Sequence, residues 1–385
     1  MVNRVQRALF LSLLGFVLSC GEESVEVADE PCTDEENAAC FVDQQGCANA
    51  ACHACETATY ADGSGSCIPI AGERAHHQFD QFTTQPGEEI SGLCQSWTLG
   101  NDEELWVNAV ELVQDQASHH SNWTFVPESY FEGPDGVWPC DDREYDQLTA
   151  AIAGGVLYAQ STQAGREVQK FPDGAAVFLP ARVRIIGDVH IINATSKAIT
   201  GSTSLTLYSI PKAQVTARLT PFHMTYHGLA IPPLASSRFH GTCFVGDQYA
   251  ESNDGAPLPM KLYYALPHTH TLATRFFLEA VGGPKDGTVL LDVSGYNGEA
   301  RGRLYDPPID LSGLSGLRFG CEFENPRNEV IHYGLGDQEM CETLGFIESP
   351  VAFESSIDEA IPDGTNGDLQ IFTGECQSYV GNFFD

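Results

Sequence analysis

Short strand-like runs, separated by Gly, Pro, Asn and Asp, are the feature that most constrains how this 385-residue chain can fold. From about residue 75 onward the runs have the length and the β-branched and aromatic content of strands. We find no long, well-capped amphipathic helix among them. Many short strands at this spacing predict β-sandwiches or jelly rolls. The expected strands cover residues 105–113, 155–160, 176–179, 183–192, 204–209, 261–265, 274–280 and 288–293.

The β-rich part of the chain is long enough for two sandwiches. The strand pattern is interrupted between residues 213 and 235, where Pro221, Pro232 and Pro233 occur. We therefore predict an all-β fold with two tandem antiparallel β-sandwich, jelly-roll-like domains. Their expected bounds are 75–215 and 216–385, and a small disulfide-rich module precedes them.

The first 20 residues have the pattern of an export signal. Arg4 and Arg7 precede an apolar run that is too short to span a membrane comfortably. The sequence Val17-Leu-Ser-Cys20-Gly21 resembles a bacterial lipobox, which implies cleavage before Cys20 and lipidation of Cys20. An ordinary signal peptide is the alternative. Residues 21–31 are typical of an acidic, flexible tether. We expect an exported protein, lipid-anchored at the cell envelope (the bacterial outer membrane or cell surface).

The chain has 13 cysteines, and 12 remain once Cys20 is set aside. An even number in an exported chain predicts disulfides. Residues 32–70 have little apolar content and are expected to form a disulfide knot, a spacer or docking module. A zinc site at Cys52-His-Ala-Cys55, with His53 as a further donor, is the alternative there. The module contains Cys32, Cys40, Cys47, Cys52, Cys55 and Cys67, and the rest of the chain contains Cys94, Cys140, Cys243, Cys321, Cys341 and Cys376.

The formal net charge of -34 excludes some classes of partner. Nucleic acid and anionic lipid both require positive charge on the protein. We expect membrane contact only through the lipid on Cys20, and we interpret the acidity as a source of solubility.

Two histidines, His268 and His270, are separated by one residue in Leu266-Pro-His-Thr-His-Thr271. Alternate side chains of a strand share a face, so both imidazoles would project to one side and could bind one metal ion. A pair of surface or core histidines is the structural alternative. The adjacent pair His76 and His77 has no strand-like surroundings, and we interpret it as surface.

The other candidate ligands are His119, His120, His190 and Met340. Adjacent residues of a regular strand face opposite sides, so His119 and His120 can reach one metal only at a strand end, a bulge or a turn. His190 is expected to share a strand face with Asp188, which could orient its ring; a satisfied core histidine is the alternative. Met340 alone is more often a core residue, but a thioether beside imidazoles favours copper.

Taken together, these segments resemble the copper type II, ascorbate-dependent monooxygenases, which include peptidylglycine α-hydroxylating monooxygenase and dopamine β-monooxygenase. The resemblance covers roughly residues 75–350, in matching order and at similar separations. The segments that carry it are His119-His120 (the family's His-His doublet), Asp188-Val-His190 (its third histidine), Pro267-His-Thr-His-Thr271 (its His-Thr-His segment) and Gly336-Asp-Gln-Glu-Met-Cys341 (its Glu-Met-Cys segment).

The resemblance implies two coppers per chain. His119, His120 and His190 would hold the electron-transfer copper, and His268, His270 and Met340 the catalytic copper that binds dioxygen. It also implies the disulfides Cys94–Cys140, Cys243–Cys376 and Cys321–Cys341. The expected activity is hydroxylation of a C–H bond of a small-molecule substrate by dioxygen, with ascorbate or another one-electron reductant as co-substrate.

Two departures from the family narrow this expectation. Peptide-processing members hold a peptide carboxylate with an arginine where this chain has Leu266. They also use asparagine and tyrosine where this chain has Glu342 and Leu344. Peptide amidation is therefore not expected, and the substrate is expected to be apolar or cationic.

Two other functions remain open from the sequence. A non-catalytic copper-binding or adhesion lipoprotein could keep the fold without the substrate clamp. A zinc hydrolase would need a well-placed carboxylate base and would leave Met340 unexplained.

Overall fold

The computed structural model describes residues 51–62, 64–114, 118–161, 164–295, 302–334 and 336–381, and the backbone alone at 45–48 and His119. The export signal, Cys20 and the acidic tether are outside the described residues. Among the helices that the structure does describe, none is long and apolar enough to cross a membrane.

The predicted all-β, sandwich-like fold is confirmed. One sheet of the first half has five strands in the order β10-β7-β14-β9-β11. It contains all the described candidate ligands of this half. Its strands are β7 (Glu89–Thr98), β9 (Ser118–Pro127), β10 (Gly136–Pro139), β11 (Gly155–Gln160) and β14 (Val183–Ile192).

A second sheet of 11 strands joins the two halves, in the order β23-β20-β26-β17-β13-β8-β16-β5 with β12, β27 and β30 beside this path. It crosses from one half to the other where β13 runs parallel to β17, with Ala175 opposite Ala217. In the first half its strands are β5 (Glu73–Gln78), β8 (Leu105–Gln114), β12 (Arg166–Lys170), β13 (Ala175–Leu179) and β16 (Thr203–Ser209). In the second half they are β17 (Ala217–Thr225), β20 (Lys261–Thr269), β23 (Arg303–Asp310), β26 (Cys341–Glu348), β27 (Ala352–Ile357) and β30 (Cys376–Gly381).

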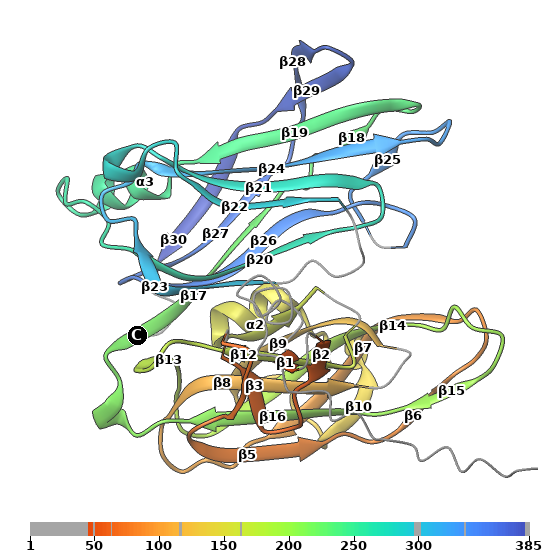
Figure 1. The fold of residues 1–385 in the computed structure, drawn as a ribbon, viewed down its shortest axis with the longest axis vertical. Helices are drawn as coiled ribbons and strands as arrows, with labels where there is room; N and C mark the ends of the chain where they lie inside the picture. The colour runs from red at the N-terminus through yellow and green to blue at the C-terminus, as the bar shows by residue number, and fades with distance from the viewer. Residues whose placement is uncertain are drawn as a thin grey trace, which may run out of the picture.

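A six-stranded sheet completes the second half, which lies above the first in Figure 1. Its strands are β19 (Ala235–Cys243), β21 (Ala273–Val281), β22 (Val289–Ser294), β24 (Gly316–Asn325), β28 (Ile361–Asn366) and β29 (Leu369–Thr373). Short hairpins and helices complete the described fold: β1 (Gln45–Ala48), β2 (Ala51–Ala54), β3 (Thr59–Ala61), β4 (Cys67–Pro69), β6 (Phe82–Thr84), β15 (Ile199–Gly201), β18 (Ala230–Ile231), β25 (Ile331–His332), η1 (Cys140–Arg143), α2 (Gln147–Ala153), η2 (Lys212–Gln214), α3 (Val245–Ser252) and η3 (Gly283–Lys285).

The strand predictions can be compared with these bounds. β11 and β14 have the predicted bounds, and the proposed division at 215/216 falls in the loop between η2 and β17. β20 continues beyond the predicted end at Ala265, so it includes His268. The interpretation of His76 and His77 was wrong in one respect, because both lie in β5, where His77 stacks on Trp97 with ring centroids 5.2 Å apart.

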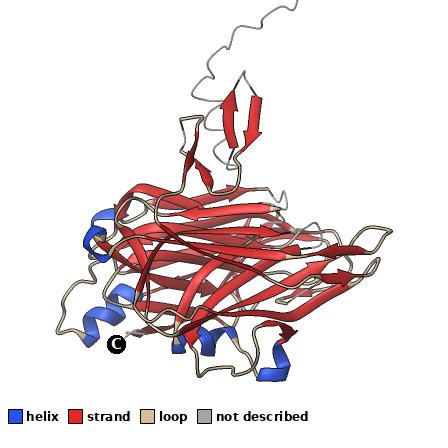
Figure 2. Cartoon of the chain, turned by 90° about the horizontal axis from the view of Figure 1, so that it is seen from below, coloured by secondary structure: helices blue, strands red, loops and turns tan. Residues whose placement is uncertain are grey.

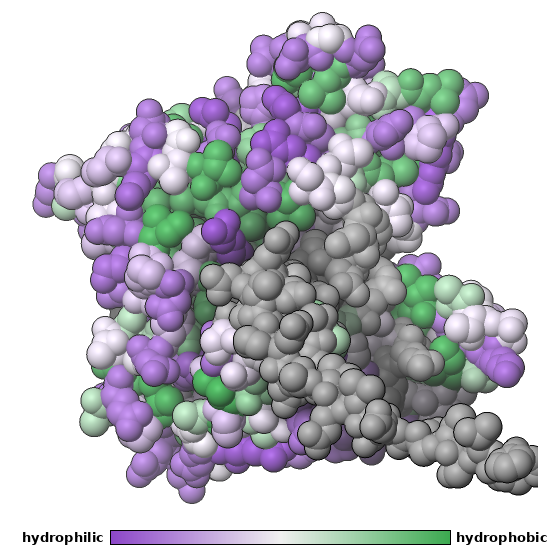
Figure 3. Space-filling view, viewed as in Figure 1, coloured by the Kyte–Doolittle hydropathy of each residue, from purple (hydrophilic) through white to green (hydrophobic). Residues whose placement is uncertain are grey.

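Two apolar cores meet at the junction of the halves. The core of the first half includes Tyr264, Leu266 and Phe346, which belong to strands of the second half. Phe346 is fully buried, and its ring centroid lies 5.1 Å from that of Phe171 in a perpendicular contact. This apolar joint places β20 and β26 against the first half. Hydrophilic residues occupy much of the visible outer surface (Figure 3), in keeping with the high net charge.

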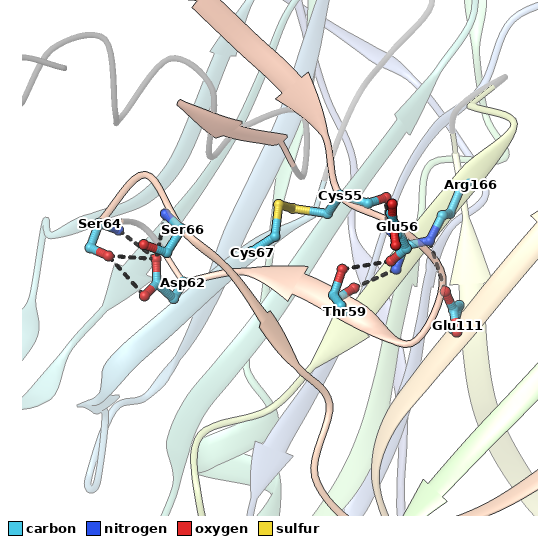
Figure 4. Close-up of a disulfide and its surroundings, with 9 residues drawn as sticks. All are labelled: Cys55, Glu56, Thr59, Asp62, Ser64, Ser66, Cys67, Glu111 and Arg166. Atoms are coloured by element: carbon cyan, nitrogen blue, oxygen red, sulfur yellow. Dashed lines mark hydrogen bonds and ion pairs between the residues drawn. A yellow bond between two sulfur atoms is a disulfide. The ribbon is translucent and has the colours of Figure 1, made fainter. Parts of the chain in front are cut away.

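The backbone of the small N-terminal module docks on an ion pair of the first half, between Glu111 of β8 and Arg166 of β12. Glu111, whose side chain is 2% exposed, accepts a hydrogen bond from Arg166 Nε at 2.7 Å. It also accepts a hydrogen bond from the backbone N–H of Ala58 at 3.0 Å. Arg166 donates to the carbonyl oxygens of Cys55 and Thr59. Figure 4 shows Glu111 and Arg166 beside these two residues. In Figure 2 the module projects from the layered strands of the body.

The described cysteines are paired. Cys55 is bonded to Cys67, and Cys52 is also disulfide-bonded, so their thiolates are not zinc ligands in this structure. In the two halves the structure contains Cys94–Cys140, Cys243–Cys376 and Cys321–Cys341, the pairs that the resemblance implies.

Candidate metal site

Four of the candidate histidines form one row of rings across the junction of the halves. The ring centroids of His190 and His120 are 5.0 Å apart, and so are those of His120 and His268. The centroids of His268 and His270 are 5.2 Å apart. We call His120 and His190 the first end of this row, and His268 and His270 the second end. The described histidines of the two predicted ligand sets are therefore adjacent.

The first end is built by strand pairing and a bulge. His120 in β9 is the register partner of His190 in β14, but Ile191 pairs with Ser118, which leaves His119 as an extra residue in β9. A bulge breaks the strict alternation of side chains. Of the three breaks that the sequence left open at the His119-His120 pair, the backbone contains a bulge.

The nitrogen separation at the first end is compatible with a shared metal ion. His190 Nδ1 lies 3.2 Å from His120 Nε2. Two nitrogen ligands that each lie about 2.0 Å from one ion are about 3.3 Å apart in a tetrahedral arrangement. Apart from the side chain of His119, which is not described, no group of three or more His, Cys, Asp or Glu in the described part has the arrangement of a metal site.

The carboxylate that contacts His190 is Glu89, a residue that the sequence analysis did not single out. Glu89 Oε1 lies 2.8 Å from His190 Nε2. Asp188, which we expected to orient the ring, accepts a hydrogen bond from Gln147 at 2.8 Å. Burial raises the pKa of Asp188, although the Gln147 hydrogen bond and the charge of His190 oppose this.

At the second end, both rings are held through Nδ1. Ser161 of the first half places its Oγ 2.8 Å from His268 Nδ1, and the Gln338 carbonyl oxygen lies 2.8 Å from His270 Nδ1. These contacts make Nε2 the nitrogen of each ring suited to a metal. Burial lowers the pKa of His270, which favours the neutral imidazole that a metal requires.

Met340 is half-buried and directly precedes β26, beside the segment that contacts His270. The neighbouring Glu339 is 1% exposed and accepts hydrogen bonds from the backbone N–H groups of His270, at 3.0 Å, and Leu272, at 2.6 Å. Burial raises the pKa of Glu339 to about 7, although these hydrogen bonds act in the opposite direction. Glu339 therefore ties the turn containing His270 to the segment containing Met340.

A polar network lies beside His268 on the same face of the sheet. Glu342 is the register partner of His268, and its carboxylate is bonded by Thr225 Oγ1 at 3.2 Å and by the Tyr333 hydroxyl. Burial alone would raise the pKa of Glu342. The hydrogen bond and positive charge of His223 hold that pKa below its usual range.

The two leucines at the family's clamp positions lie on this face as well. Leu266 is the register partner of Leu344, two residues from His268 and Glu342 respectively. Leu266 is 3% exposed and belongs to the apolar joint, and Leu344 packs against the same core. The surroundings of the second end therefore combine an apolar surface with one ionised carboxylate.

Comparisons with known proteins do not identify a relative. No protein family matches the sequence, and no curated protein matches it. Among solved structures, the VP54 protein of PBCV-1, fitted into a reconstruction of the virophage Sputnik, shares 6% identity over 73% of this chain and 95% of its own, with a TM-score of 0.24. The exported protein XepA of PBSX shares 11% identity over 75% and 94%, with a TM-score of 0.19.

A third solved structure, of the Macrobrachium rosenbergii nodavirus, shares 9% identity over 73% of this chain and 98% of its own, with a TM-score of 0.18. Likenesses at this level carry no conclusion about family or function.

Proposed function

We propose that this protein is an extracytoplasmic dicopper monooxygenase that hydroxylates a C–H bond of a small molecule. The observation that carries the proposal is the single row of four imidazoles, contributed by both halves, with ring centroids 5.0 to 5.2 Å apart. Imidazole and thioether groups are ligands suited to copper. The resemblance of the six ligand residues and their order to a copper monooxygenase family supports the same function.

Copper held by His119, His120 and His190, and by His268, His270 and Met340, would supply single-electron steps and dioxygen activation. The reaction balances as one C–H bond, one dioxygen, two electrons and two protons giving one C–OH group and one water. A one-electron reductant such as ascorbate would supply the two electrons in succession. The chain's own part is to orient the rings and to bring the two ends together.

The substrate region is inferred from the residues beside His268. Leu344, which is partly buried, offers an apolar side chain, and Glu342 offers a carboxylate held ionised by its partners. An anionic substrate would be repelled there, since a like charge would face Glu342. We infer an apolar or cationic small molecule.

Metal content tests this function directly. The purified protein should bind two coppers per chain, and Met340→Ile should weaken one of them, by about tenfold or more, without affecting the other. Met260→Ile is the matched control, because it makes the same change at a methionine that is buried in the core of the second half. A stoichiometry of zero or one in the wild type would contradict the proposal.

A second candidate is a non-catalytic copper-binding or adhesion lipoprotein with the same fold. The observation that favours it is the burial of Leu266 in the apolar joint, at the position where the peptide-processing enzymes bind substrate. Oxygen uptake coupled to ascorbate oxidation, measured with apolar and amine substrates, separates the two. Coupled turnover supports the enzyme, and two bound coppers without oxygen uptake support the binding protein.

A further inference from the structure

Glu89 contacts His190 at the first end of the histidine row. The contact depends on a shift in the register between two strands. Glu89 begins β7, and its register partner in β14 is Ile192, not His190. The pairing of β7 with β14 shifts between Val189 and Ile191, so that two residues of β7, Ser91 and Gly92, lie opposite the single residue His190. Gly92 has a φ of 70°, a left-handed conformation that favours glycine. Bulges of this kind redirect neighbouring side chains.

The contact between Glu89 and His190 determines how the ring is used. A carboxylate oxygen accepts hydrogen bonds, so His190 Nε2 carries the proton and donates it to Glu89 Oε1 at 2.8 Å. The other nitrogen, Nδ1, then has its lone pair directed toward His120 Nε2, 3.2 Å away. The His190 side chain is 8% exposed while that of Glu89 is 44% exposed, so the carboxylate lies between a buried ring and solvent.

Glu89 also adjoins the second half. A Cβ atom placed on Gly336, at the start of the segment that leads to Met340, would lie 4.0 Å from Glu89 Oε1. Glu89 therefore lies between His190 at the first end of the row and the segment of the second half that begins at Gly336.

We propose that Glu89 is a positioning residue that fixes the tautomer and orientation of His190, so that Nδ1 is the nitrogen offered to a metal. This role of Glu89 rests on the proposed function, because it concerns how one of the two coppers is held. A carboxylate on the far nitrogen also makes an imidazole more electron-donating, which stabilises the higher oxidation state of a bound metal. Glu89 thereby makes the first end the better electron donor of the two.

The first test uses the metal-free protein labelled with nitrogen-15 in histidine. Two-bond proton–nitrogen correlation spectra should show His190 protonated at Nε2 in the wild type. Glu89→Gln keeps an acceptor oxygen and should keep this tautomer, whereas Glu89→Leu should shift it or produce a mixture. A wild-type His190 protonated at Nδ1, or a spectrum unchanged by Glu89→Leu, would overturn the proposal.

The second test uses the copper-loaded protein. Glu89→Leu should weaken one copper by about tenfold or more. Glu89→Gln should raise the reduction potential of that same copper and leave its stoichiometry unchanged. Glu88→Gln is the matched control, because it removes the same charge one residue away. The Glu88 carboxylate accepts a hydrogen bond from the backbone N–H of Gln85. Equal effects of the Glu88 and Glu89 variants would contradict a role through His190.

The two proposals fail in different ways. A wild type that binds no copper, but whose His190 changes tautomer in Glu89→Leu, removes the monooxygenase and leaves the positioning of His190 intact. A wild type that binds two coppers, with affinity and tautomer unaffected by Glu89→Leu, keeps the enzyme and removes the role of Glu89.

Discussion

The two ends of the histidine row use the same ring but hold it differently. At the first end a carboxylate, Glu89, contacts His190 directly. At the second end the contacts to Nδ1 come from uncharged groups, the Ser161 hydroxyl and the Gln338 carbonyl oxygen. A charged partner favours an oxidised metal more than an uncharged partner does. We expect this difference if the first end supplies electrons and the second receives them, as in the proposed function.

The second end also has carboxylates nearby, and other groups bond to them. Glu339 accepts backbone hydrogen bonds from the turn at His270, and Glu342 is bonded by Thr225, Tyr333 and His223. The number of acidic residues around a ring therefore says little about how the ring is held. What counts is which acid bonds to a ring nitrogen.

The largest predicted effect comes from a substitution in the apolar joint, which holds the two ends of the row together. Phe346→Ala should lower the free energy of unfolding by about 3–5 kcal/mol, because it removes a fully buried ring from the apolar joint. It should also weaken copper binding at the second end, since β26 would be held less firmly against the first half. Urea unfolding and copper titration measure the two effects.

Phe319→Ala is the matched control for this prediction. Phe319 is equally buried but belongs to the core of the second half. It should cost a similar free energy of unfolding and leave copper affinity unchanged. If both variants weaken copper binding to the same extent, the joint has no special part in aligning the row.

A smaller predicted effect is the pH dependence of stability that comes from His223, which lies between Glu342 and Glu354 near the second end. Burial alone would lower the pKa of His223, but Glu354, 2.7 Å from Nδ1, and Glu342, 3.6 Å from Nε2, raise it to about 10. A raised histidine pKa stabilises the fold fully below the unfolded value of about 6.5, and this stabilisation is lost as pH rises toward 10.

The free energy of unfolding of the wild type should therefore fall by the order of a few kcal/mol between pH 6.5 and 10 because of His223. His223→Gln should lack this part of the decline, which urea unfolding across that pH range would measure. Parallel pH profiles for the two proteins would show that His223 is not protonated between its two glutamates.

The smallest predicted effect tests the neutral contact at the second end. Ser161→Ala removes the hydroxyl that holds His268 and should cost about 1 kcal/mol of stability. It should weaken copper at the second end by about tenfold and leave the first end unchanged. Ser64→Ala, which removes a hydroxyl hydrogen bond from the small module, is the control. A loss of copper at the first end in Ser161→Ala would mean that the ends are not independent.

Much of the architecture could be predicted from local patterns. β11 and β14 were predicted to the residue, because their apolar content is bounded by breakers. β5 was missed, since the sequence Glu73–Gln78 is polar and has no strand-like pattern. Its strand character depends on pairing with β16, a contact across more than 100 residues of chain that no local window contains.

The candidate ligands were chosen by residue type and by the resemblance to a family, and the structure brings four of them together. Two adjacent histidines required a strand end, a bulge or a turn, and only the structure shows that a bulge is present. The prediction that they form two copper sites stays a prediction. Glu89 and Ser161 gave no signal in the sequence, because an isolated glutamate or serine in an acidic, exported chain is unremarkable. A search for carboxylates and hydroxyls near strand ends would have included both residues among many others.

The sequence by itself determined the all-β class, the pairing-competent cysteines and the order of the candidate ligands. These features depend on local periodicity and residue chemistry. Only the tertiary structure decided which side chains hold the rings, since the partners of His190 and His268 lie 101 and 107 residues away. Such contacts depend on strand register, on two bulges and on a sheet that crosses from one half to the other. They are set by the packing of the whole chain, which the local sequence does not specify.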